Sequence, residues 1–337
     1  MQPTPRRVVK SYNVRFSLRE ILNDGQGPPS LHDAVDLHAH AAPGTEDPLL
    51  LVQRASLAGM GIVVLKNLRP DQPPHITAAE VREQLARWCD AQGIAPCTVY
   101  HGKLTDPGEG GLDFASVREA IDHGAKVVWM PVISSAHNLY RVGSPRRAVK
   151  ADGLPPGPVV GPLSWEEALH RGQYLLDEHG RLKPVVKEIL QLVADRGVTL
   201  SFAHSSKPEM EALAEECGRL GYRQAFIDHP YGPQVGLEFE ELKPFAEAGI
   251  WFNFTYDELS PLLGVDPQDM FDTIKALGPE HFTLSSDAGN YLLPPAVDAY
   301  DMLVRYGRAY GLSNAELRMI TVENPRKVLG LPVPAAS

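Results

Sequence analysis

The chain has 337 residues, of which 43% are hydrophobic and 22% are charged, and its formal net charge is −10. This composition is ordinary for a globular protein, and the negative balance argues against nucleic acid as a partner, because phosphate binding needs a basic surface. Three cysteines without a CxxC pair favour a reducing compartment, and we expect the cytoplasm. Neither a secretory signal nor a run of eighteen apolar residues is present, so we expect no membrane association.

Eight short, β-branched apolar runs recur along the chain and are separated by helix-like segments. The runs cover residues 34–40, 61–67, 95–104, 126–133, 198–206, 224–232, 249–257 and 282–290. Their near-continuous hydrophobicity is typical of strands that are buried on both faces. Alternation of strand and helix indicates parallel βα units, and eight units predict a (β/α)8 TIM-type barrel rather than a doubly wound open sheet.

The helical segments carry start signals of their own. A hydroxyl residue followed three positions later by Glu is typical of a capping box, and four such pairs occur: Thr77 with Glu80, Ser164 with Glu167, Ser206 with Glu209, and Ser313 with Glu316. Apolar residues at helical spacing follow or surround several of these pairs, which predicts helices over 77–92, 183–196, 207–220 and 294–311.

A single barrel domain is predicted over residues 34–331, with residues 1–33 as an N-terminal extension packed on it. The connection after the fourth strand, residues 134–185, is unusually long and includes a Pro/Gly-rich stretch and a predicted hairpin over 174–184. Because it leaves the C-terminal end of a strand, we expect it to cover the barrel mouth as a lid. A plain surface insertion or an oligomer contact is the alternative.

Histidines and an aspartate end several of the predicted strands. His38 and His40 end the first, and residues i and i+2 of a strand point to the same side. An H-x-H pair alone is weak evidence in a chain with twelve histidines, but three further polar residues end the fifth, sixth and eighth strands: His204, His229 and Asp287. All five therefore lie at the end of the barrel where active sites form, and imidazole and carboxylate are usual zinc ligands.

This order of residues resembles the amidohydrolase superfamily, and the segment 322–331 is similar to that superfamily's closing helix. The resemblance implies a divalent metal, with zinc as the first expectation, bound by His38, His40 and Asp287. It also implies that His204 and His229 hold a second ion where there is one. Asp287 would be the catalytic residue that takes a proton from the attacking water.

The fourth strand departs from the binuclear pattern, because it ends without the bridging lysine or glutamate that such members usually carry. Lys66 instead ends the second strand, after a buried apolar run where an unpaired ammonium would be costly. We therefore hypothesise that Lys66 is carboxylated and bridges two metals. The alternatives are that it binds an anionic substrate, or that it pairs with Asp287 or Asp36.

Further polar residues at or beyond strand ends are candidates for substrate binding. We expect substrate contacts from His101, Arg146, Tyr231 and Asn253. Other polar residues at or just beyond strand ends are Asn67, Ser134, His137, Tyr256 and Asp257. His101 is equally well read as a core histidine. Arg146 belongs to a basic cluster with Arg141, Arg147 and Lys150, which could bind a substrate anion or be merely solvated. Asp36 either orients a histidine or anchors its strand.

The sequence thus predicts a metal-dependent hydrolase that attacks an amide, cyclic amide or lactone carbonyl of a small, anionic or neutral substrate. Two alternatives stay open: a mononuclear decarboxylase on the same scaffold, and a non-catalytic metal-binding interaction module. A homo-oligomer is an expectation from the resemblance alone. No Walker A loop and no G-x-S-x-G elbow occur, so nucleotide and serine hydrolase chemistry is unsupported.

Overall fold

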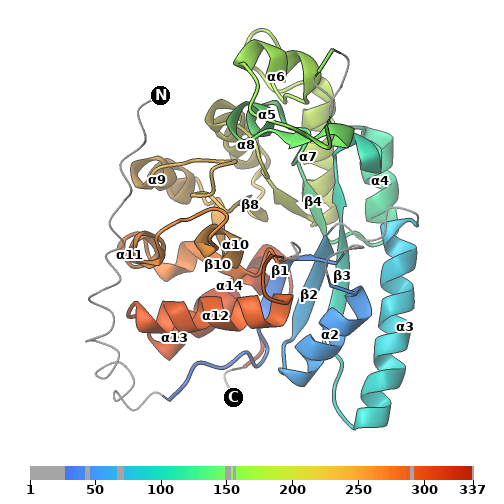
Figure 1. The fold of residues 1–337 in the computed structure, drawn as a ribbon, viewed down its shortest axis with the longest axis vertical. Helices are drawn as coiled ribbons and strands as arrows, with labels where there is room; N and C mark the ends of the chain where they lie inside the picture. Colours follow the sequence, from blue (N-terminus) through green and yellow to red (C-terminus); the bar gives the residue numbers. More distant parts are fainter. Residues whose placement is uncertain are drawn as a thin grey trace.

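The computed structural model describes residues 27–41, 46–66, 72–148, 153–154, 157–288 and 292–335. Each of the eight predicted apolar runs contains a strand, and all eight strands form one sheet (Figure 1). The strands are β1 (Val35–His40), β2 (Ile62–Lys66), β3 (Thr98–Leu104), β4 (Val127–Trp129), β7 (Thr199–Ser201), β8 (Ala225–Asp228), β9 (Trp251–Thr255) and β10 (Phe282–Ser285).

The sheet follows chain order, β1-β2-β3-β4-β7-β8-β9-β10, and every neighbouring pair is parallel. The last strand returns to the first through backbone hydrogen bonds beyond its C-terminal end. Asp287 N donates to His38 O at 2.8 Å, and His40 N donates to Ala288 O at 3.0 Å. The sheet is therefore a nearly closed (β/α)8 barrel, as predicted, and the closing bonds lie at the rim where the histidines end β1.

Helices surround the strands on the outside of the barrel (Figure 1). The predicted helices over 77–92, 183–196, 207–220 and 294–311 are confirmed, the third with the predicted ends and the others with shifted ends. The helices that follow strands or complete the barrel are α2 (Pro48–Leu57), α3 (Pro74–Gln92), α4 (Phe114–Asp122), α7 (Pro184–Arg196), α8 (Lys207–Leu220), α9 (Phe239–Glu247), α10 (Tyr256–Leu259), α11 (Pro267–Leu277), α12 (Ala296–Ala309), α13 (Asn314–Arg318) and α14 (Asn324–Val328).

Three of the four predicted capping boxes are present, at Ser164, Ser206 and Ser313. The prediction at Thr77 was wrong, because α3 already begins at Pro74 and Thr77 lies buried inside its first turn. Proline at the first helical position needs no hydrogen-bonded N–H and sets the helical φ angle, so it starts this helix without a side-chain cap.

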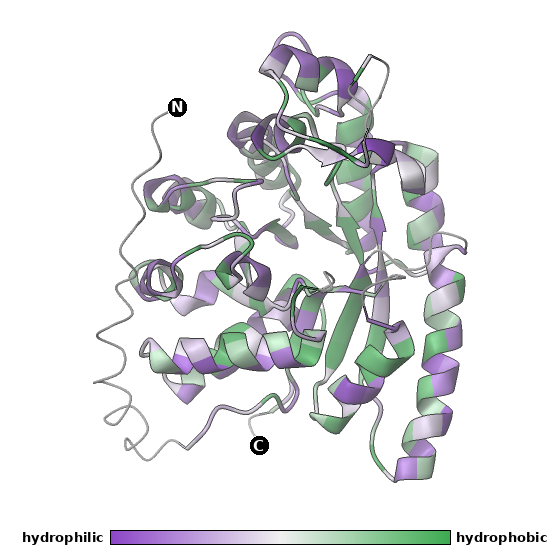
Figure 2. Ribbon diagram, in the orientation of Figure 1, coloured by the Kyte–Doolittle hydropathy of each residue, from purple (hydrophilic) through white to green (hydrophobic). Residues whose placement is uncertain are grey.

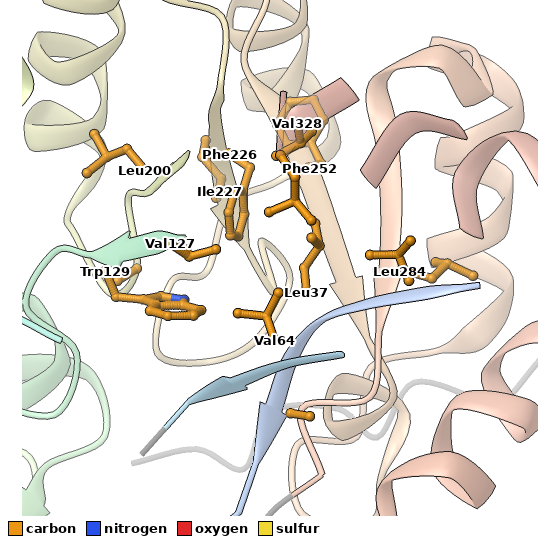
Figure 3. Close-up of a cluster of buried hydrophobic side chains, with 14 of the residues drawn as sticks. Leu37, Val64, Val127, Trp129, Leu200, Phe226, Ile227, Phe252, Leu284 and Val328 are labelled. Atoms are coloured by element: carbon orange, nitrogen blue, oxygen red, sulfur yellow. The ribbon is translucent and has the colours of Figure 1, made fainter. Parts of the chain in front are cut away.

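The strands carry the most hydrophobic residues of the chain, while the helices mix hydrophobic and hydrophilic residues (Figure 2). Buried side chains from different strands meet in one core, including Val64, Val127 and Phe226 (Figure 3). This burial on both faces of the sheet explains why the strands read as continuous apolar runs.

The insertion after β4 contains α5 (Ala136–Arg141), α6 (Trp165–Arg171) and a small antiparallel pair, β5 (Ser144–Pro145) with β6 (Val159–Val160). Its own apolar cluster consists of Leu139, Val160 and Ala168. The predicted hairpin is present as an antiparallel bridge between Leu176 and Leu182. The insertion is thus a folded unit with a core of its own, and not an irregular loop.

The opposite end of the barrel is covered by the C-terminal segment. Asn324, the first residue of α14, donates to the carbonyls of Pro279 and Phe282 at 2.8 Å, where β10 begins. Thr199, where β7 begins, donates to Val328 O at 2.8 Å. In the described part of the N-terminal extension, Leu31 packs on the barrel core; residues 1–26 lie outside the described residues. No helix in the described part of the chain has the length and apolar composition that a membrane span needs.

Candidate metal centre

Three of the predicted ligands form a compact triangle at the C-terminal rim of the barrel. Nε2 of His38 lies 3.1 Å from Nε2 of His40, and each of these nitrogens lies 3.0 Å from Oδ1 of Asp287. Donor atoms that share a tetrahedral zinc at bond lengths near 2.0 Å are spaced about 3.3 Å apart. The three side chains are therefore already arranged as one face of a metal coordination shell.

His229 and His204 extend this group on the side of β8 and β7. Nε2 of His229 lies 3.9 Å from Oδ2 of Asp287, and His38, His229 and Asp287 form a buried group that could hold a metal ion. The rings of His204 and His229 meet edge to face, with centroids 4.9 Å apart. Nδ1 of His204 lies 2.7 Å from Oδ1 of Asn138 in the insertion, which leaves Nε2 as its ligand atom.

Lys66 reaches the same group from β2. Its Nζ lies 2.8 Å from Nε2 of His38 and 5.1 Å from the ring centroid of Trp129. Trp129 ends β4, the strand from which a bridging ligand was expected, and its ring lies next to His38 with centroids 5.8 Å apart. A bulky indole therefore occupies the inner side of β4. The lysine that reaches the candidate metal ligands, Lys66, comes from β2.

Asp228 supports the candidate metal ligands from the barrel interior. The sequence alone did not point to this residue. Its carboxylate accepts hydrogen bonds from four side chains on four strands: His38 Nδ1, Asn253 Nδ2, Trp129 Nε1 and Ser201 Oγ. A carboxylate that accepts from one imidazole nitrogen directs the other nitrogen at the metal. Its position directly before His229, at the end of a buried apolar strand, was the available signal.

One inward position on the third strand carries no side chain. A Cβ atom on Gly102 would lie 2.0 Å from the Trp129 ring and 2.8 Å from Val127 O. The glycine therefore makes room for the indole, whose nitrogen donates to Asp228 at 2.9 Å.

Backbone strain is concentrated at this rim. Among the described residues, only four other than glycine have a positive φ angle, and two of them are His229 at 33° and Asp287 at 45°. Ala203, at 49°, directly precedes His204. Such conformations are costly for residues with a Cβ atom and persist where the surrounding structure enforces them, often at functional sites.

Burial keeps most of the histidines neutral and able to bind a cation. It lowers the pKa of His40 and of His229 to about 4, and it lowers the pKa of His204 well below the usual value. For Asp287, burial alone would raise the pKa, but His38 and His40 hold it well below its usual range. At neutral pH the site therefore offers imidazole nitrogens and an ionised carboxylate, which is a suitable donor set for zinc.

His38 and Lys66 form a coupled pair. Burial alone would lower the pKa of His38, but the carboxylates of Asp287 and Asp228 outweigh burial and raise the pKa to about 9. Burial lowers the pKa of Lys66. Two cations 2.8 Å apart would repel strongly, and burial disfavours the charged form of Lys66.

Asp36 anchors the strand and is not placed among the ligands. Its Oδ1 accepts from the backbone N–H groups of His38 and Ser286, and its Oδ2 accepts from the Ser286 hydroxyl. Burial raises the pKa of Asp36 to about 6. Of the two predicted roles, the structure therefore favours the anchor, because these bonds tie β1 to the segment that carries Asp287.

The structure places His101, a predicted substrate contact, on the side of β3 that faces the outer helices. The neighbouring position, Gly102, faces Trp129 inside the barrel, so His101 faces the outer helices. Burial lowers its pKa to about 4, and the charge of Arg82 on α3 lowers it further. His101 is a buried histidine between the sheet and its helices, which was the alternative interpretation.

Two further substrate-binding candidates are held by protein groups. The Tyr231 hydroxyl bonds to Thr273 Oγ1 of α11 at 2.6 Å, on the outer layer of the barrel. The Asn253 side chain is fully buried, and its Oδ1 accepts from Thr283 and Ser285 while its Nδ2 donates to Asp228. The structure thus makes Asn253 a support of Asp228 and Tyr231 a link to α11.

Arg146 lies in the insertion, where its Nη1 donates to Leu154 O at 3.3 Å. Arg141 donates to Pro233 O, and Nε2 of His137 lies 3.0 Å from Val235 O, so the insertion is fastened to the loop after β8. Asn67 and Lys150 lie outside the described residues.

Comparisons with known proteins agree with this fold. A sequence model described as a family of unknown function (DUF6282) matches residues 33–253. No curated protein matches the chain in sequence. Similar solved structures include an amidohydrolase from Pseudomonas aeruginosa, with 12% identity, 88% of this chain and 96% of the other covered, and a TM-score of 0.54.

Two other solved structures have comparable similarity. A probable dipeptidase, PvdM, from Pseudomonas aeruginosa is 13% identical, with 94% and 98% of the two chains covered and a TM-score of 0.53. A mutant PTE-like lactonase from Deinococcus radiodurans is 16% identical, with 90% and 98% covered and a TM-score of 0.51. At these identities the likeness shows the fold, a (β/α)8 TIM barrel, and no particular reaction.

Proposed function

Because this chain belongs to the family of unknown function DUF6282, whose description names no reaction, we propose from the site itself that the protein is a metal-dependent hydrolase. The observation that carries the proposal is the triangle of donor atoms in His38, His40 and Asp287, with sides of 3.0–3.1 Å. A small-molecule substrate with an amide, cyclic amide or lactone carbonyl suits this chemistry, and we place the enzyme in the cytoplasm.

The donor set fits a divalent ion such as zinc. His38, His40 and Asp287 would hold the first ion, and His204 and His229 would take part in holding a second. When bound, such an ion lowers the pKa of water toward neutrality and polarises a carbonyl group. Asp287 is ionised and lies at the centre of the group, so it is placed to take the proton from the attacking water.

The remaining residues of the centre keep these groups in position. Asp228 fixes the His38 ring through Nδ1, and Asn138 of the insertion fixes the His204 ring through Nδ1. Ser135 at the start of α5 also donates to His204 O at 2.6 Å. Because the insertion touches a ligand candidate directly, we propose that residues 134–185 border the mouth and help to exclude water from it.

We also propose that Lys66 is carboxylated. A neutral amine at Nζ would attack carbon dioxide, form an N–C bond and release one proton, which yields a carbamate with two oxygens. Lys66 meets the requirements because it is 2% exposed, its pKa is lowered by burial, and its Nζ lies beside Nε2 of His38. The carbamate oxygens would then serve as the bridge that Trp129 prevents β4 from supplying.

A mononuclear decarboxylase is the second candidate. The observation that favours it is the pairing of Lys66 with His38 beside Trp129, since a protonated lysine there would bind a substrate carboxylate instead of forming a carbamate. A third candidate is a metal-binding module without catalysis, which would use the same donor atoms and is distinguished from the enzyme by assays of turnover.

Elemental analysis of protein prepared without chelators, before and after the substitution Lys66→Ala, tests these proposals. Two ions per chain that fall to one or none in the variant would support the bridged hydrolase. One ion per chain in both proteins would exclude the carbamate bridge. Mass spectrometry of the intact chain under carbon dioxide would check the added mass directly.

A panel of lactones, amides and aromatic carboxylic acids, assayed with the metal-loaded protein, separates the reaction types. Turnover of a lactone or amide that is lost in Asp287→Asn would support hydrolysis. Release of carbon dioxide without hydrolysis would support the decarboxylase. Full metal content with no turnover across the panel would favour the binding module.

A further inference from the structure

The first 26 residues differ in charge from the rest of the chain. They contain five basic residues and two acidic ones, which gives +3, while the whole chain carries −10 and residues 27–337 therefore carry −13. The basic residues are Arg6, Arg7, Lys10, Arg15 and Arg19. A positive segment joined to a strongly negative body is attracted to acidic parts of its surface.

The same segment has an alternating pattern. Tyr12, Val14, Phe16 and Leu18 alternate with polar or basic residues over 12–19. In an extended backbone this alternation gives one apolar face and one polar, basic face. The segment thus suits a surface that offers apolar contacts together with carboxylates.

The barrel has such a surface between α8 and α9. A groove of about 680 Å³ lies there, and both helices contribute glutamates to its walls. Its acidic residues are Glu211, Glu215, Glu240, Glu241 and Glu247, its basic residues are Lys207 and Arg223, and its apolar residues include Ala214, Pro244, Phe245 and Ala248. The groove is therefore acidic on balance and apolar in part.

The carboxylates of the groove differ in their partners. Lys207 pairs with Glu241 at 2.8 Å, and Lys243 pairs with Glu240 at 2.7 Å. Within the described ranges, no basic side chain pairs with Glu215 of α8 or with Glu247 of α9. These two exposed carboxylates, one on each wall, are available to the arginines of an incoming segment.

We propose that residues 6–19 of this same chain dock in the groove between α8 and α9. The apolar face of the segment packs on Pro244 and Ala248, which keep exposed surface in the groove, and its arginines pair with Glu215 and Glu247. Twenty-six extended residues reach about 85 Å, whereas a chain of this length has a diameter on the order of 50 Å, so the segment is long enough to reach the groove.

Disulfide trapping in the full chain tests the proposal. Ser17→Cys is combined with Gly218→Cys, because Gly218 lines the groove and a Cβ atom there meets no atom within 4 Å. The matched control combines Ser17→Cys with Gly108→Cys, a position that is equally open but outside the groove. The native cysteines, Cys89, Cys97 and Cys217, are buried and do not compete.

We expect the groove pair to form an intramolecular disulfide several-fold faster than the control pair at low salt. Adding Glu215→Lys and Glu247→Lys should slow it to the control rate. Equal rates for the two pairs, or no effect of the charge reversal, would overturn the proposal. A disulfide that joins two chains on a non-reducing gel would also overturn it, because a second copy would then supply the segment.

Discussion

Nδ1 of His38 lies 3.1 Å from Oδ1 of Asp228, and both side chains are completely buried. The bond joins the first strand of the barrel to the sixth across its interior. It makes Nδ1 the donor and turns Nε2 toward His40 and Asp287, where a metal would be bound.

Replacing Asp228 with Asn should therefore weaken metal binding without removing a ligand. The amide keeps the size of the carboxylate but loses its charge, and its nitrogen faces donors such as Trp129 Nε1 and Ser201 Oγ. We expect the metal affinity to fall about 10- to 100-fold, measured by competition with a chromophoric chelator. Ser201→Ala, which removes only one donor, should have a smaller effect; equal metal affinity in wild type and Asp228→Asn would contradict the positioning role.

Two histidine variants should distinguish a metal ligand at the barrel rim from a structural histidine on the outer face of the barrel. His40→Ala should lose metal, because it removes one corner of the donor triangle. His101→Ala should keep the metal content of the wild type and lose on the order of 2 kcal/mol of unfolding free energy through the cavity it leaves. Elemental analysis and urea unfolding measure the two effects, and metal loss in His101→Ala would contradict its placement outside the barrel.

Gly102→Ala should disturb the centre from a strand that contributes no ligand. The added Cβ would meet the Trp129 ring and Val127 O at distances that atoms do not tolerate, so the indole must move away from Asp228. We expect a destabilisation of about 3 kcal/mol or more together with weaker metal binding. Gly108→Ala, where a Cβ meets nothing within 4 Å, is the control. Similar stability and metal affinity in the two variants would argue against the packing described.

The pH dependence of stability should report on Glu209. Burial raises the pKa of this capping carboxyl to about 7, from the usual 4.5. The folded state therefore binds a proton that the unfolded state releases between pH 4.5 and 7, and the wild type loses stability as the pH rises through this window. Glu209→Gln cannot titrate, so its unfolding free energy relative to wild type should rise over the same window.

The size of that relative gain is on the order of 3 kcal/mol at most. Chemical denaturation of both proteins at pH 5, 6, 7 and 8 would measure it. A constant difference across this series would show that Glu209 has an ordinary pKa in the folded protein.

Much of the architecture could be read from the sequence, because it depends on local patterns. All eight strands were located by their apolar runs, and the ends of those runs placed His38, His40, His204, His229 and Asp287 at one rim. Such inferences require only that parallel strands end at the same side of a barrel. The predicted start of α3 at Thr77 was wrong, because Pro74 and a capping box at Thr77 are both helix-start signals. The sequence does not say which of the two begins the helix.

The direction in which a strand residue points was harder to predict, because β3 has polar residues on both faces. His101 and Gly102 are neighbours, and only the position of Trp129 decides which one faces the interior. Tyr231 lies beyond the end of β8 and Asn253 in the middle of β9, and Thr273 and Asp228 engage their polar groups.

The sequence by itself determined the barrel and the set of candidate ligands, since both follow from residue type and spacing along a strand. Only the tertiary structure decided how these groups are held. Asp228 gathers donors from β1, β4, β7 and β9, whose residues lie far apart in the chain. Contacts of this kind depend on how the strands twist and close around the axis, and no local pattern encodes that geometry.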